Sequence, residues 1–183
     1  MRFIPITLLM LTLLGGANAT TFYVNDNSTF ADVYTTAIGN NSNPGTASSP
    51  FADLSFAMTV VVSGDSILVD AGNYTDINIS IPSTFSSITI SGASITTTIF
   101  DGTSASGIFN FMDIRGTNIK VEKMTVQNYD SGGAVDIFGS SVIDSTRVNF
   151  SDCYFYQNET YTGFDPNPNG GAFYVGTSGA NLP

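Results

Sequence analysis

The chain has 183 residues, of which 15 are acidic and only 5 are Lys or Arg, so its formal net charge is −10. It contains no histidine and a single cysteine, Cys153. Ser-His-Asp and Cys-His catalysis, histidine-based zinc sites and intrachain disulfides are therefore excluded. An acidic surface also repels a phosphate backbone, so nucleic acid is not an expected partner, and no organic cofactor is predicted.

Residues 1–19 have the pattern of a signal peptide. Arg2 supplies the positive charge, Ile4 to Leu14 form a short apolar stretch, and small residues precede a cleavage site between Ala19 and Thr20. The apolar stretch is shorter than the ~20 residues needed to cross a bilayer, although an uncleaved anchor is the alternative interpretation. The pattern predicts a secreted or cell-surface protein that does not span the membrane after cleavage.

Residues 20–76 are expected to form an N-terminal cap, which contains a strand, a polar loop and one helix, and the first strand after it. The helix is predicted from Ser49 as N-cap and Pro50 as the first helical residue to its end at Ser63-Gly64. Its apolar face would consist of residues at helical spacing: Phe51, Leu54, Ala57, Met58 and Val61.

Residues 77–183 are expected to consist of short strands that contain an internal repeat. Residues 119–126 match residues 148–155 at a constant offset of 29, and all four apolar positions agree. Each copy is followed by an Asn and then by a Gly-Gly pair that opens another strand, at 132–137 and at 170–175. A repeat of this kind predicts stacked coils, with an antiparallel sandwich as the alternative.

The period-two pattern predicts which side chains point inward in these coils. The expected core residues are Ile77, Ile79, Ile88, Ile90, Ile119, Val121, Met124, Val126, Val148, Phe150, Cys153 and Phe155. Cys153 is interpreted as a small buried apolar residue and not as a nucleophile.

Five segments near the N-terminus carry a family resemblance: Tyr23–Asn25, Gly39–Thr46, Ser49–Phe51, Gly64–Ile67 and Ala71–Tyr74. They resemble the opening of secreted right-handed parallel β-helix proteins of the pectate-lyase-like superfamily, and the resemblance covers roughly residues 22–175. It implies an all-β, right-handed parallel β-helix, or solenoid, whose open end is covered by the N-terminal helix.

The resemblance implies an adhesin-like or glycan-binding role on an extracellular polysaccharide or cell-surface glycan. The alternative is an extracellular lyase or hydrolase acting on acidic polysaccharide, with its active site beyond this segment. Residues 176–183 do not have the pattern of a capping unit, so we expect the coils to continue in a longer surface protein.

Catalytic candidates are few. Lyases of the resembled superfamily use an Arg or Lys base beside acidic residues that hold Ca²⁺, but no catalytic motif can be matched to the basic residues Arg115, Lys120, Lys123 and Arg147. Stacked coils could align an acidic stripe formed by Asp113, Asp136, Asp144 and Asp152.

A weak metal candidate lies between residues 165 and 170. Asp165, Asn167 and Asn169 match the first half of a calcium-loop pattern, but Gly176 stands where the bidentate acid is required. A proline-rich loop exposed to solvent is the alternative interpretation.

Two further features concern the late coils. Asn128 and Asn158 are expected at matching corners, where their amides could stack. A platform for sugar rings is predicted from a cluster of late aromatic residues, namely Tyr154, Tyr156, Tyr161, Phe164 and Tyr174.

Overall fold

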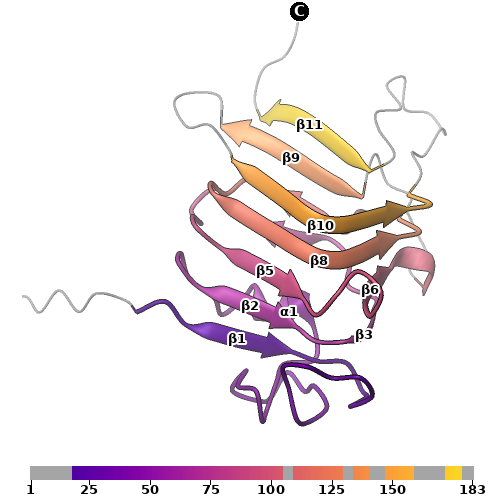
Figure 1. The fold of residues 1–183 in the computed structure, drawn as a ribbon. Helices are drawn as coiled ribbons and strands as arrows, with labels where there is room; N and C mark the ends of the chain where they lie inside the picture. The colour runs from indigo at the N-terminus through magenta and orange to yellow at the C-terminus, as the bar shows by residue number, and fades with distance from the viewer. Residues whose placement is uncertain (1–17, 105–108, 130–133, 141–146, 159–171, 179–183) are drawn as a thin grey trace, which may run out of the picture.

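The computed structural model describes residues 18–104, 109–129, 134–140, 147–158 and 172–178. The described part is an all-β protein in which every pair of strands is parallel (Figure 1). Its strands are β1 (Thr21–Val24), β2 (Ser66–Val69), β3 (Gly72–Tyr74), β4 (Ile79–Ile81), β5 (Thr89–Gly92), β6 (Thr98–Asp101), β7 (Met112–Ile114), β8 (Ile119–Gln127), β9 (Val135–Ser140), β10 (Val148–Tyr156) and β11 (Phe173–Ser178).

The strands form two sheets. The larger sheet has the order β1-β2-β5-β8-β6-β3, with β10 paired to β8, and the smaller sheet has the order β11-β9-β7-β4. β1 and β11 lie at opposite ends of the described structure (Figure 1). No helix in the described part of the chain is long and apolar enough to cross a membrane.

The predicted repeat is confirmed as a strand register. Val121 on β8 pairs with Phe150 on β10, and Val126 pairs with Phe155, both at the predicted offset of 29. Val135 on β9 pairs with Phe173 on β11 at an offset of 38, which is the separation of the two Gly-Gly pairs. The two copies therefore lie next to each other in space, as the matching pattern of apolar residues indicates.

β8 and β10 bend at equivalent positions. Lys123 and Asp152 both have left-handed backbone conformations, with φ of 58° and 51°. Because of this bend, the first half of β8 pairs with β5 and its second half pairs with β6. Each long strand thus contributes to two differently oriented parts of the larger sheet, and Figure 1 shows the same bend in both.

The core contains a column of aromatic rings. Tyr74, Phe100, Phe111 and Tyr129 are buried, and successive ring centroids are 5.0, 4.7 and 5.6 Å apart. Of the twelve predicted core residues, seven are buried: Ile79, Ile88, Ile90, Ile119, Val121, Met124 and Val126. The others are partly buried and pack against this core: Ile77, Val148, Phe150, Cys153 and Phe155.

The predicted helix is much shorter in the structure. α1 spans Leu54–Ala57 only, with Asp53 and not Ser49 at the N-cap. The backbone of Phe51 instead pairs with β1, since its N–H donates to Tyr23 O and its carbonyl accepts from Asn25 N, both at 2.9 Å. The predicted apolar face is buried as expected, but most of it is not helical.

Candidate functional site

Two tyrosines of β10 lie on its outer face. Tyr154 and Tyr156 alternate with Cys153 and Phe155, which point toward the core, as the pleat of a strand requires. Their side chains are 53% and 45% exposed. The ring centroids are 5.9 Å apart and the ring planes differ by only 13°. The structure therefore brings two of the five predicted platform residues together as an exposed pair.

A row of polar side chains extends from this pair across two neighbouring strands. Tyr156 is in register with Gln127 on β8, and Gln127 is in register with Asp101 on β6. The Gln127 amide donates to Asp101 Oδ2 at 2.8 Å, and the Asn128 amide donates to Asp101 Oδ1 at 2.9 Å. These groups form a fixed set of hydrogen-bonding atoms, with Gln127 next to Tyr156 and Asp101 one strand further away.

Asp101 is held in its ionised form. Burial alone would raise its pKa, but hydrogen bonds from Thr103, Asn128 and Gln127 outweigh that effect and lower the pKa to about 2. The polar row therefore carries a negative charge at neutral pH.

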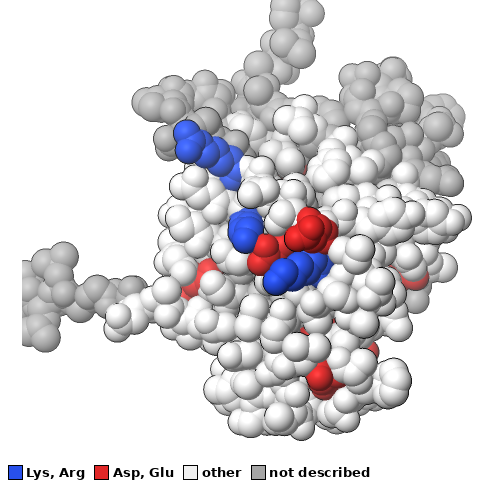
Figure 2. All heavy atoms as spheres, viewed as in Figure 1, with Lys and Arg blue, Asp and Glu red and all other residues white. Residues whose placement is uncertain are grey.

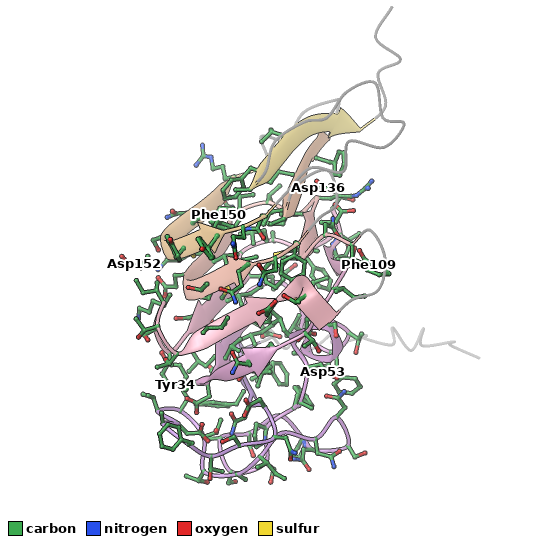
Figure 3. The ribbon with its side chains drawn as sticks, turned by 90° about the vertical axis from the view of Figure 1, so that its right-hand side faces the viewer. Tyr34, Asp53, Phe109, Asp136, Phe150 and Asp152 are labelled. Atoms are coloured by element: carbon green, nitrogen blue, oxygen red, sulfur yellow. The ribbon has the colours of Figure 1, made fainter. Side chains whose placement is uncertain are left out.

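A depression of about 390 Å³ lies next to Tyr154. One wall is the loop between β5 and β6, which is fixed by the Thr125 hydroxyl donating to Ile95 O at 2.7 Å. Figure 3 shows Asp152, one of the residues that line the depression, at the left-hand edge of the molecule. The depression is lined by Ala93, Ser94, Ile95, Lys123, Asp152, Cys153 and Tyr154.

The predicted basic residues do not converge on one acidic cluster. Lys120 Nζ lies 2.6 Å from Glu122 Oε2, and this hydrogen bond lowers the Glu122 pKa. Arg115 Nη2 lies 3.1 Å from Asp113 Oδ2. Asp113 belongs to β7 in the smaller sheet, whereas β10 belongs to the larger sheet. Figure 2 shows a central group in which basic and acidic side chains intermingle, a separate basic patch at the upper left and scattered acidic patches, with mostly uncharged surface between them.

The predicted acidic stripe is only partly formed. Asp113 on β7 is in register with Asp136 on β9, so these two carboxylates lie on adjacent strands. Burial raises the Asp136 pKa, a hydrogen bond from Asn110 lowers it, and the charge of Asp113 raises it further. Asp152 belongs to β10 in the other sheet, and Asp144 lies outside the described residues.

The two corner asparagines do not stack amide on amide. The Asn128 amide donates to Asp101, whereas the Asn158 amide donates to Val126 O at 2.9 Å and its oxygen accepts from Tyr129 N. The Asn128 side chain therefore binds the end of β6, and the Asn158 side chain binds β8 and the residue Tyr129 that follows it.

Several predicted site residues cannot be placed. Asp165, Asn167 and Asn169 of the calcium candidate lie outside the described residues, as do Tyr161 and Phe164. Tyr174 is placed only as part of β11. Within the described ranges, no group of three or more His, Cys, Asp or Glu side chains is arranged to hold a metal ion.

Sequence reasoning missed Gln127 and Asp101. β5 and β6 are separated by a loop at residues 93–97, whereas β8 is a single strand that pairs with both. The residue spacing of β5 and β6 therefore differs from that of β8. The signal that could have found them is the polar residue that ends the apolar alternation at each corner, in Asp101-Gly102 and in Gln127-Asn128.

Comparisons with protein-family models, with curated proteins and with solved structures gave no match to this chain.

Proposed function

We propose that the chain is a secreted or cell-surface right-handed parallel β-helix protein, related to the pectate-lyase-like superfamily, that binds an extracellular glycan through Tyr154 and Tyr156. An adhesin-like role within a larger surface protein belongs to the same proposal. The solenoid is supported by the strand registers. Beyond β2, paired strands are separated by 23 to 38 residues, and each pair is parallel.

The exposed tyrosine pair is the observation that carries the glycan proposal. Sugar rings have an apolar face that packs on aromatic rings, and sugar hydroxyls require hydrogen-bonding partners at the edge of such a platform. Tyr154 and Tyr156 supply the rings, whereas the partners are Gln127, in register with Tyr156, and Asp101 on the next strand. The adjacent depression offers room for a further sugar unit.

Affinity electrophoresis in gels that contain soluble polysaccharides tests this proposal. At least one polysaccharide should retard the wild-type chain, and Tyr154→Ala with Tyr156→Ala should abolish the retardation. Phe30→Ala is the matched control, because Phe30 is an exposed aromatic residue, 87% accessible, in the loop that follows β1, and it does not line the depression beside Tyr154. Retardation that survives the tyrosine double substitution, or that Phe30→Ala abolishes, would disprove the assigned face.

A polysaccharide lyase or hydrolase is the second candidate. The pairing of Asp113 with Asp136 favours it, since two carboxyl groups on adjacent strands can serve as acid and base, and burial raises the pKa of Asp136. We expect no turnover by this chain in absorbance and reducing-sugar assays on pectate and alginate with added Ca²⁺. Turnover that Asp136→Asn or Arg147→Ala abolishes would favour the enzyme over the binding protein.

A further inference from the structure

The charges around Tyr154 and Tyr156 bear on the kind of glycan that this face accepts. Asp101 lies two strands from Tyr156, about 10 Å away at the usual strand spacing, and it stays ionised. Asp152 lines the depression beside Tyr154. Lys123, which lines the same depression, is the one cation there among the described residues. The local formal charge is therefore negative, in a chain whose net charge is −10.

The other cations of the chain are placed elsewhere. The sequence has five Lys and Arg residues in all. Arg2 belongs to the predicted signal peptide, Arg115 is paired with Asp113 on the smaller sheet, and Lys120 is paired with Glu122. Arg147 precedes β10 and lines a separate depression with Lys120, at the opposite end of that strand from Tyr156.

Recognition of a sugar carboxylate or sulfate requires an arginine fork or a cluster of lysines to replace the lost hydration. The face around the tyrosine pair has neither, and its two carboxylates would repel a second anion. By contrast, its flat rings, its amide groups and its fixed carboxylate suit uncharged sugars, whose hydroxyls donate to carboxylates and accept from amides.

We infer that the glycan bound at Tyr154 and Tyr156 is a neutral polysaccharide, and that the Asp101 and Asp152 carboxylates exclude acidic ones. This inference rests on the proposed glycan binding and specifies the ligand class of the same face.

The test compares two sets of polymers in affinity gels of low ionic strength. The neutral set is xylan, mixed-linkage β-glucan and galactomannan, and the acidic set is polygalacturonate and alginate. We expect retardation by a neutral polymer at least about tenfold stronger than by either acidic one. Raising NaCl to about 0.15 M should leave the neutral binding unchanged, because no ion pair is involved.

The outcomes distinguish the inference about ligand class from the proposal of glycan binding. Retardation by an acidic polymer that equals or exceeds the neutral result, is weakened by salt and is lost in Tyr154→Ala would overturn the inference and leave the glycan proposal standing. Retardation by neither set would overturn both. Retardation by the neutral set alone, lost in Tyr154→Ala and retained in Phe30→Ala, supports both.

Discussion

Val121 on β8 lies directly opposite Phe150 on β10, although 29 residues separate them in the chain. Val121 is 1% exposed, and Phe150 packs against the same core. Phe150 also contacts Phe155 and Phe173, with ring centroids 5.7 and 5.0 Å away. Phe150 thus connects β10 to β8 through Val121 and to the smaller sheet through Phe173.

Val121→Asp should severely destabilise the protein, because it buries a charge that has no partner in the core. We expect a loss of more than about 4 kcal/mol in the free energy of unfolding, measured by urea denaturation. Asn149→Asp is the control on an exposed position of β10 and should change stability by less than about 0.5 kcal/mol. Similar stabilities for the two variants would show that the register of β8 is wrong.

Tyr129→Phe tests the packing of the aromatic column. The buried Tyr129 hydroxyl donates to Asp76 O at 2.7 Å, so its removal leaves a buried carbonyl without that donor. The expected loss is about 1–2 kcal/mol in urea denaturation. Tyr34→Phe removes a longer bond of 3.1 Å from a half-buried side chain and should cost less. The reverse order of these two losses would contradict the structure.

The register of the repeat could be predicted because both copies alternate apolar and polar residues with the same period. Val121 and Phe150 occupy equivalent positions in that pattern, and stacking equivalent positions buries both. The length of the helix could not be predicted in this way. Phe51 is spaced from the next apolar residues as in a helix, but its backbone hydrogen-bonds to Tyr23 and Asn25. Those residues are distant in sequence, so a local pattern cannot predict the contact.

The candidate site was predictable only in part. Tyr154 and Tyr156 could be predicted because alternation places both on one face of a strand. Their polar neighbours Gln127 and Asp101 come from two other strands, and their alignment depends on the loop that separates β5 from β6. A loop insertion changes the register without leaving a periodic signal.

Acid should destabilise the fold through two carboxylates with lowered pKa values. Asp70 is buried, which by itself raises its pKa, but backbone N–H groups of Val33, Ala71 and Tyr34 and the Thr35 side chain lower it overall. The Asp101 pKa is lowered to about 2. The unfolded chain therefore takes up these protons near pH 3.8, before the folded chain does, and stability falls as the pH drops from about 4 toward 2.

Denaturation at several pH values checks this prediction. Asp101→Asn should flatten the loss of stability between pH 4 and 2, because it removes one of the two carboxylates. Asp76→Asn should instead change the profile above pH 4, since burial raises the Asp76 pKa and protonation of that group stabilises the folded state there as the pH falls. Identical slopes in wild type and Asp101→Asn would refute the assigned role.

Cleavage of the predicted signal peptide should create a stabilising ion pair. The backbone N–H of Thr20 donates to Asp65 Oδ1 at 2.8 Å, and Asp65 is 2% exposed. After cleavage at Ala19, the same nitrogen becomes an ammonium group, which strengthens this bond. Asp65→Asn should therefore cost more stability in a chain that begins at Thr20 than in one that retains Asn18 and Ala19. Equal losses in urea denaturation of the two chains would argue against the pair, and mass spectrometry of the secreted protein locates the cleavage.

An NMR titration of the tyrosine rings tests the central claim most directly. The chain has eight tyrosines and no tryptophan, so its aromatic ring signals can be assigned by single Tyr→Phe substitutions. When xylohexaose, cellohexaose or mannohexaose is added, we predict that the ring signals of Tyr154 and Tyr156 shift in a saturable manner while those of Tyr23 and Tyr34 stay fixed. Shifts confined to Tyr23 or Tyr34, or no shift with any of the three sugars, would contradict the assignment of a neutral-glycan site to the outer face of β10.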